Sequence, residues 1–212
     1  MQAIIGKKIG MTQVYDDQGV HVPVTVLQVG PCVVVQVKTV ENEGYGAAQL
    51  GFGERKAKNA GKAQEGHCKK AGQPVQRVLR EVALDAGEAV KVGDTVGAAL
   101  FKDVGFVDVI GITKGRGFQG VVKRHGFRGG PAAHGHTSHR RPGSIGNRTW
   151  PSRVFKNRRM GGHMGFVRMT QQNLKIVQVR ESDNVILVRG AVPGPTGSIL
   201  LVRKAIKKAA KK

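Results

Sequence analysis

Three histidines, His134, His136 and His139, stand at a spacing that would suit a metal ion. Imidazole nitrogens are common ligands of zinc and copper. No carboxylate or cysteine lies near them in the sequence to complete a coordination shell, and the adjacent Arg140 and Arg141 would repel a cation. We therefore predict no metal site, and the three imidazoles remain hydrogen-bond donors or stacking planes for another kind of partner.

A glycine-rich stretch, GRGFQG at 115–120, matches the GxGxxG fingerprint of dinucleotide-binding loops and follows a predicted strand. A dinucleotide site also needs an acid about 20 residues further on to hold the ribose hydroxyls. The next acid is Glu181, and no alternation of strands and helices surrounds the loop. We interpret the glycines as letting the backbone approach a sugar-phosphate chain beside four basic residues, Lys114, Arg116, Lys123 and Arg124.

The positive charge of the chain is concentrated in one third of its length. Of the 212 residues, 35 are Lys or Arg and 14 are Asp or Glu, which gives a net charge of +21. No acid occurs in the 72 residues 109–180, which contain 15 Lys and Arg, so this run carries +15. A surface that is merely soluble mixes both signs. The segregation therefore predicts a polyanionic partner, and nucleic acid is the partner that most often fits such a chain.

Other classes of protein fit the composition less well. The Ser, Thr and His residues of the acid-free run have no carboxylate near them in sequence, so we predict no catalytic residues, no enzyme activity and no cofactor. No stretch is long and apolar enough for a membrane helix, and only 5% of residues are aromatic, so we expect no membrane partner. The two cysteines, Cys32 and Cys68, form no CxxC pair and are expected to be free thiols in a reducing cytosol, with a single disulfide between them as the alternative.

Residues 126–162 form a long segment that is poor in core-forming side chains and rich in Gly, Pro, Arg and His. Such a segment cannot bury enough apolar surface to fold alone, so we expect it to be ordered by RNA. Its single tryptophan, Trp150, is expected to stack on a base or plug against RNA rather than to anchor a core. Four basic side chains near it would bind phosphates: Arg153, Lys156, Arg158 and Arg159.

The rest of the chain has the short alternating apolar runs of β-strands. A hairpin is predicted from 11–15, a turn at 16–19 and the alternating Val20, Val22, Val24 and Val26. Further strands are predicted at 32–38, 77–84, 95–101, 106–113, 166–170, 174–180, 185–189 and 198–203. Their close spacing and Gly/Pro turns favour a small barrel. We expect 1–40, 94–125 and 163–204 to build the barrel, 41–93 to be an inserted α+β subdomain, 126–162 to be an extended basic loop, and 205–212 to be a basic tail.

Several motifs together resemble one family, the bacterial form of the universal large-subunit ribosomal protein three, or L-three, family. They are IIGKKIGMTQVY at 4–15, GHCKKAG at 66–72, VDVIGITKGRGFQGVVKRHGF at 107–127, SHRRPGSIGNRTWPSRVFKNRRMGGHMG at 138–165 and ILVRGAVPGPTG at 186–197. The resemblance spans nearly the whole chain. Because Met1 lies only a few residues before the first motif, we expect no transit peptide and a bacterial cytoplasmic protein.

The resemblance implies a fold and a role. The fold would be mainly β, a six-stranded Greek-key barrel like those of translation factors, with an inserted subdomain and a loop ordered by RNA. The protein would be a structural constituent of the large ribosomal subunit that binds 23S-type ribosomal RNA early in assembly and contacts neighbouring ribosomal proteins. The tip of the loop, 145–151, would approach the peptidyl transferase centre, and catalysis would belong to the RNA. No small-molecule substrate and no homo-oligomer are expected.

The residues and the resemblance together give the predicted RNA-binding side chains. They are Lys7, Lys8, Lys114, Arg116, Lys123, Arg124, His125, Arg128, His134, His136, His139, Arg140, Arg141, Asn147, Arg148, Trp150, Arg153, Lys156, Arg158, Arg159 and His163. Two alternatives remain open at this point. One is a basic protein that packages DNA without sequence preference, and the other is a dinucleotide-dependent enzyme built on the 115–120 loop.

Overall fold

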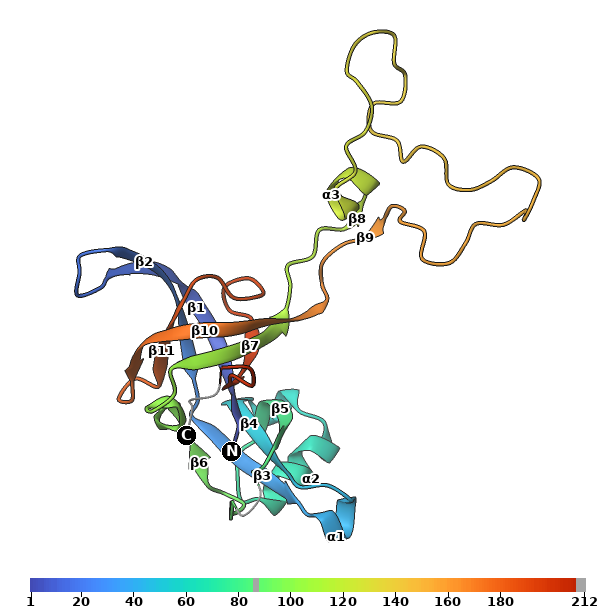
Figure 1. The fold of residues 1–212 in the computed structure, drawn as a ribbon. Coiled ribbons are helices and arrows are strands. Elements are labelled where there is room, and N and C mark those ends of the chain that lie inside the picture. Colours follow the sequence, from blue (N-terminus) through green and yellow to red (C-terminus); the bar gives the residue numbers. More distant parts are fainter. Residues whose placement is uncertain (86–87, 209–212) are drawn as a thin grey trace. The chain divides into compact units, whose positions relative to one another are not determined.

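The computed structural model describes residues 1–85 and 88–208, and most of its regular structure is β-strand (Figure 1). Residues 209–212 of the predicted basic tail lie outside the described residues. The chain divides into two compact units: unit 1 consists of Met1–Ile112 and Arg168–Lys212, and unit 2 consists of Thr113–Val167. None of the helices among the described residues has the length and apolar character needed to cross a membrane.

Unit 1 contains a closed antiparallel barrel of six strands, which confirms the small barrel that the strand pattern favoured and the six strands that the family resemblance implied. The order around the barrel is β1-β12-β7-β10-β11-β2, and each neighbouring pair is antiparallel. Strands β7, β10 and β11 are consecutive neighbours, and β12 returns to lie beside β7, which is the Greek-key arrangement. The six strands are β1 (Ala3–Tyr15), β2 (His21–Val29), β7 (Phe106–Ile112), β10 (Arg168–Arg180), β11 (Val185–Arg189) and β12 (Ile199–Lys204).

The barrel forms because alternate residues of its strands are apolar and face inward. In β2, Leu27 and Val29 are fully buried in the main core, while Val22 and Val24 pack with Leu187 in a smaller cluster. Val26 packs against that smaller cluster, whereas Val20 precedes the strand and is exposed. The alternation therefore predicted the strand, but the predicted valines within β2 pack in the smaller cluster, while Leu27 and Val29, at positions of the opposite parity, pack in the main core.

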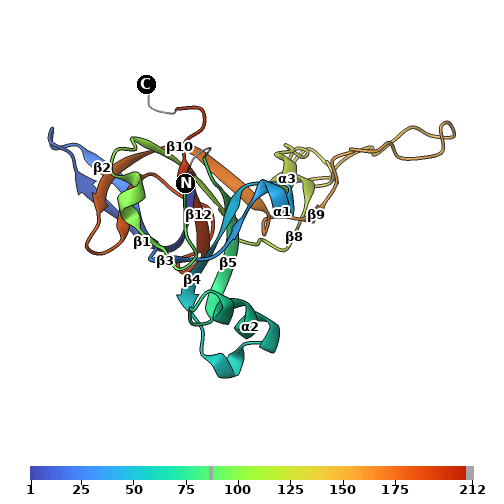
Figure 2. The same cartoon turned by 90° about the horizontal axis from the view of Figure 1, so that it is seen from below.

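A four-stranded antiparallel sheet shares the hydrophobic core of unit 1. Its order is β5-β4-β3-β6, and its buried Val34, Leu50 and Phe52 belong to the same cluster as Ile4 and Val107 of the barrel. Strand β3 lies in the segment 1–40 but pairs with β4 and β6 of this sheet. Figure 2 shows the sheet together with its short helices. The elements are β3 (Cys32–Lys38), α1 (Val40–Glu43), β4 (Ala47–Glu54), η1 (Ala57–Asn59), α2 (Lys62–Lys70), β5 (Gln76–Ala83), β6 (Thr95–Val96) and η2 (Ala98–Phe101).

Strand β10 is one long strand where the sequence predicted two. Its pairing with β7 shifts register between Gln171 and Leu174, and Asn173 within the shift has a left-handed φ of 57°. The backbone N–H of Asn173 donates to Asp108 Oδ1 at 2.9 Å. The polar residues Gln171, Gln172 and Asn173 occupy this irregularity and interrupt the apolar pattern, which is why the sequence indicated a break.

Unit 2 contains little regular structure. Its elements are β8 (Phe118–Gln119), α3 (Val121–His125) and β9 (Gly162–His163), and β8 pairs with β9 in a two-stranded sheet. From residue 126 to residue 161 the structure describes turns and bends but no helix or strand.

Candidate nucleic-acid interface

A short hydrogen-bonded stem closes unit 2 where the chain enters and leaves it. The N–H of Thr113 donates to Val167 O at 3.0 Å, and Arg116 N–H donates to Met164 O at 2.9 Å. Met164 N–H in turn donates to Gly117 O at 2.9 Å, and the β8-β9 pair continues the ladder. The stem needs glycine at Gly165, where φ is +75° and an added Cβ would overlap the carbonyl oxygen of Lys114. The two ends of the 126–162 loop are thereby held side by side.

Helix α3 fixes the loop just after the stem. Arg124 donates a hydrogen bond from Nη1 to Met160 O at 2.9 Å, and His125 Nε2 lies 3.0 Å from the same oxygen. A Cβ on Gly162 would collide with the Arg124 guanidinium, so glycine at this position lets the arginine lie across the backbone. The helix ends at Gly126, which adopts the left-handed conformation that commonly closes helices. Two of the predicted binding residues therefore also join the two sides of the loop.

The histidine segment folds back on the first part of the loop. Gly130 N–H donates to His139 O at 3.0 Å, and His139 Nδ1 lies 2.9 Å from Pro131 O. The rings of His136 and His139 meet edge to face, with centroids 6.3 Å apart. A concavity of about 480 Å³ lies here, and its lining includes Phe127, Arg128, His136, Ser138 and Arg141. Within the described residues, no three His, Cys, Asp or Glu side chains gather as a metal site.

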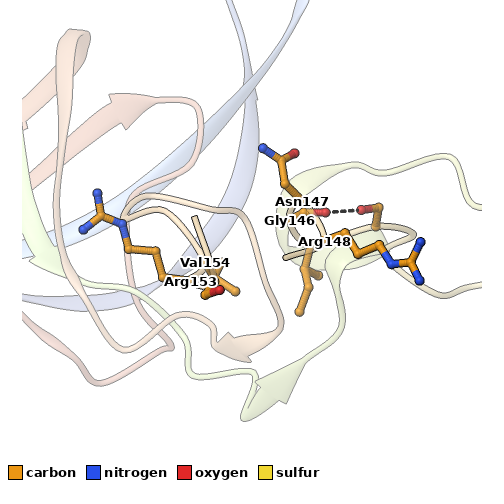
Figure 3. Close-up of a pocket in the computed structure, with 8 residues that line it drawn as sticks. Gly146, Asn147, Arg148, Arg153 and Val154 are labelled. Atoms are coloured by element: carbon orange, nitrogen blue, oxygen red, sulfur yellow. Dashed lines mark hydrogen bonds between the residues drawn. The ribbon is translucent and has the colours of Figure 1, made fainter. Parts of the chain in front are cut away.

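The tip of the loop forms an open pocket of about 610 Å³ between residues 144–148 and 152–154. Ser144 Oγ donates to Gly146 O at 2.9 Å, and the guanidinium of Arg158 donates to Ser144 O. Figure 3 shows the guanidinium groups of Arg148 and Arg153 pointing in opposite directions, away from one another. Arg153 lies over the ring of Phe155, with its Cζ 5.7 Å from the ring centroid. The residues that line the pocket at the tip thus include two arginines, Arg148 and Arg153, and no acid.

The basic side chains of unit 2 face solvent without carboxylate neighbours in their own segment. Residues 113–167 contain twelve Lys and Arg and no Asp or Glu, and all twelve of these side chains are exposed. Two of these side chains, Arg124 and Arg158, donate hydrogen bonds to backbone carbonyls, those of Met160 and Ser144. A surface of this kind attracts phosphates, because each contact releases counterions that had condensed on the nucleic acid.

The structure brings most of the predicted binding residues into unit 2. His125 is half-buried, and the following predicted residues are exposed: Lys114, Arg116, Lys123, Arg124, Arg128, His134, His136, His139, Arg140, Arg141, Asn147, Arg148, Trp150, Arg153, Lys156, Arg158, Arg159 and His163. Lys7 and Lys8 lie instead on β1 in unit 1. Lys7 is exposed, but Lys8 is only 7% exposed and its Nζ donates to Val192 O at 3.2 Å and Gly194 O at 3.1 Å. The Lys8 ammonium group is thus directed to carbonyls of the β11–β12 connection.

Exposed aromatic rings in unit 2 go beyond the residue that the sequence singled out. Trp150 is 83% exposed, in agreement with its predicted place outside a core. Phe118, Phe155 and Phe166 are also more than half exposed, and sequence reasoning did not select them. Their signal was available, since each is an aromatic residue beside glycine or basic residues in an acid-free segment. Such rings offer faces on which nucleobases stack.

The dinucleotide alternative finds no support in the surroundings of the 115–120 loop. The glycine-rich stretch leads through the two-residue strand β8 into α3, which has only five residues. Strand β7, which precedes the loop, pairs antiparallel with both of its neighbours, whereas the dinucleotide fold needs parallel strands joined by helices. The glycines serve the stem and the start of a short helix.

Comparison with known proteins gives a consistent result over the length of the chain. A family model described as ribosomal protein L3 matches residues 72–184. The chain is 50% identical over 206 residues to the large ribosomal subunit protein uL3 of Pelobacter propionicus, which covers 97% of this chain and 99% of that protein. It is 48% identical to the protein of the same name from Geobacter metallireducens and 50% identical to that of Heliobacterium modesticaldum, each over 97% of this chain and 98% of the relative.

Proposed function

Because the chain belongs to the ribosomal protein L3 family, we propose that it is a structural constituent of the bacterial large ribosomal subunit that binds ribosomal RNA and has no catalytic activity of its own. The observation that carries the proposal is unit 2, in which twelve exposed cations stand on a segment without a single acid. On this reading the protein works in the cytoplasm as part of the ribosome, and its partners are large-subunit RNA and neighbouring ribosomal proteins.

The proposed mechanism is electrostatic and architectural. Arginine forks bind two phosphate oxygens at once, and lysines act as point charges that neutralise crowded backbones. Exposed rings such as Trp150 and Phe155 supply stacking faces for unpaired bases. The stem and the contacts to Met160 O hold the ends of the loop together, so that less of the loop must be ordered on binding.

We extend the proposal to finer parts of the role, which the family resemblance implies. The loop 126–162 would reach into the RNA, and its tip at 145–151 would approach the peptidyl transferase centre. The protein would join the subunit early in assembly, as a single copy, without a small-molecule substrate or a membrane contact. Each of the predicted binding residues of unit 2 would then contact phosphate, sugar or base.

Footprinting of large-subunit ribosomal RNA with and without the protein, at several salt concentrations, tests the proposal. We expect protection at a few sites that persists at high salt. A variant with Arg140, Arg141 and Arg159 changed to Gln should lose part of this protection, and the slope of log K against log salt should become shallower by roughly 2 to 3. Diffuse protection that disappears with salt, and equal affinity for random duplex DNA, would instead support the DNA-packaging alternative.

A further inference from the structure

A second concentration of positive charge lies in unit 1, away from the acid-free run. Residues 54–80 contain eight Lys and Arg and two acids, Glu54 and Glu65. The remaining residues outside 109–180 contain twelve basic and twelve acidic side chains, so their formal charges cancel. The excess of positive charge outside residues 109–180 therefore falls entirely on residues 54–80. We call its eight basic residues the α2 patch: Arg55, Lys56, Lys58, Lys62, Lys69, Lys70, Arg77 and Arg80.

Three of the eight cations of the α2 patch, Lys62, Lys69 and Lys70, lie on helix α2, which is hydrogen-bonded to the sheet. Gln64 Nε2 donates to Gln76 O of β5 at 2.7 Å, and His67 Nε2 lies 2.6 Å from Gln49 Oε1 of β4. Cys68 on the same side of the helix is fully buried. These three positions, at i, i+3 and i+4, form one helix face against the sheet, and Figure 2 shows α2 and the loop before it at one end of β4 and β5. Lys62, Lys69 and Lys70 are therefore left on solvent-facing positions of a fixed element.

Most cations of the α2 patch have no ion-pair partner among the described residues. All eight side chains are exposed. Among the described residues, one of the eight forms an ion pair: Lys69 Nζ lies 2.8 Å from Glu65 Oε1. Elsewhere in unit 1, the basic side chains Lys38, Lys102 and Arg203 are each paired with a carboxylate. The patch is thus a surface with charge that the protein itself does not neutralise.

A cavity of about 430 Å³ adjoins the patch and contains Arg77 together with Lys7 of β1. Its lining also includes three amide side chains, Gln28, Gln73 and Gln76, and one carboxylate, Glu54. Cations bind phosphate oxygens, and amides can donate to and accept from the edges of bases. Lys7, which the sequence placed among the RNA-binding residues, therefore lines the same cavity as Arg77 of the α2 patch.

We propose that the α2 patch is a second RNA-binding surface, which holds backbone phosphates of ribosomal RNA independently of unit 2. The inference rests on the proposed function, because it takes ribosomal RNA as the partner. The composition of the patch favours RNA over an acidic protein. Protein interfaces have an apolar centre and are depleted in lysine. The segment 54–80 contains five lysines and, among its described residues, no exposed large apolar side chain.

The test compares three full-length variants with the unchanged protein in footprints on large-subunit ribosomal RNA. The patch variant has Lys58, Lys62 and Lys70 changed to Gln, and the loop variant is Arg140, Arg141 and Arg159 to Gln. The control variant has Lys91, Arg189 and Lys207 changed to Gln, three exposed cations outside both surfaces. We expect the patch variant to lose a set of protected nucleotides that the loop variant keeps, with a salt slope shallower by roughly 2 to 3. The control should keep both sets.

Changing Lys58, Lys62 and Lys70 to Arg keeps the charge and should restore the protection, which separates loss of phosphate contacts from loss of fold. If the patch variant matches the control while the loop variant loses its nucleotides, the second surface is refuted and the proposed function stands. If the unchanged protein gives no site-specific protection, the proposed function fails and the second surface fails with it. Loss of contacts to an acidic ribosomal protein with every RNA protection intact would also overturn the proposal.

Discussion

Replacing Gly165 by Ala should open the stem of unit 2 while the barrel stays folded. Gly165 has a φ of +75°, and an added Cβ would overlap the backbone oxygen of Lys114, with the Lys114 carbonyl carbon 3.1 Å away. Because the obstacle is backbone rather than a mobile side-chain end, the two sides of the stem must separate. The hydrogen bonds between Arg116, Gly117 and Met164 lie directly beside this contact.

The expected cost has two parts. A left-handed conformation costs a non-glycine residue about 1 kcal/mol. Loss of the hydrogen bonds from Arg116 N–H and Met164 N–H costs about 1 kcal/mol each. Together these predict that the free energy of opening the stem falls by about 2 to 3 kcal/mol. Amide hydrogen exchange in the stem should then accelerate by roughly 30-fold to 150-fold.

Native-state hydrogen exchange of the full-length protein measures this effect segment by segment. Gly115→Ala is the matched control, since a Cβ there would lie 3.7 Å from Phe166 Cβ, an ordinary contact, at a φ outside the left-handed region. Exchange in the barrel strands should be unchanged in both variants. Equal protection of the Arg116 and Met164 amides in the two variants would refute the reasoning, as would unfolding of the barrel in Gly165→Ala alone.

Three further outcomes are expected. Deletion of residues 126–162 should leave a folded barrel by circular dichroism and thermal melting, but the shortened protein should no longer protect RNA near the catalytic centre; unfolding would contradict the predicted boundaries. Trp150→Ala should change the free energy of unfolding by less than about 0.5 kcal/mol, because the side chain is 83% exposed, yet it should impair translation by reconstituted ribosomes. A large fall in the melting temperature of the free protein would place Trp150 in a core instead. Burial raises the pKa of Cys32 to about 12, so its contribution to stability is full below the unfolded-state pKa near 8.5 and is lost as pH rises from there through about 12. Urea titrations should therefore show a shallower alkaline loss in Cys32→Ala than in the unchanged protein, and identical pH profiles would argue against a buried neutral thiol.

Much of the fold was predictable because most strands carry their own apolar alternation. Strands β2, β3, β7 and β11 were each indicated by Val and Ile at spacings of two. Strand β4 was not predicted, since Ala47, Ala48 and Gly51 are small residues with low strand propensity. The structure supplies the reason for one of them: a Cβ on Gly51 would overlap the Gln76 side chain of the neighbouring strand. The need for a small residue at Gly51 therefore comes from β5, which is distant in sequence, so no local sequence pattern reveals it.

The candidate site was predictable in its composition but not in its internal contacts. The missing acids between Asp108 and Glu181 are visible in any count of the sequence. That His125 and Arg124 meet on the carbonyl oxygen of Met160 depends on a return of the chain over more than thirty residues. The α2 patch was overlooked for a different reason. Its charges are diluted by alanine, glycine and two acids in sequence, and the contacts of α2 with β4 and β5, which leave Lys62, Lys69 and Lys70 exposed on a fixed helix, are not visible there.

The absence of acids from unit 2 also determines how this unit can be held together. Arg203 in unit 1 is held by the buried carboxylate of Asp108, the last acid before the run. Unit 2 has no such acceptor of its own, and its arginines donate to the backbone carbonyls of Met160 and Ser144 instead. A carbonyl orients a guanidinium without cancelling its charge, and Arg has five N–H donors, so others remain for phosphate. An ion pair in the same place would fix the loop equally well but would have to be broken, or its acid desolvated beside RNA, before a phosphate could bind. Carbonyl contacts therefore let the same arginines shape the loop and bind the RNA.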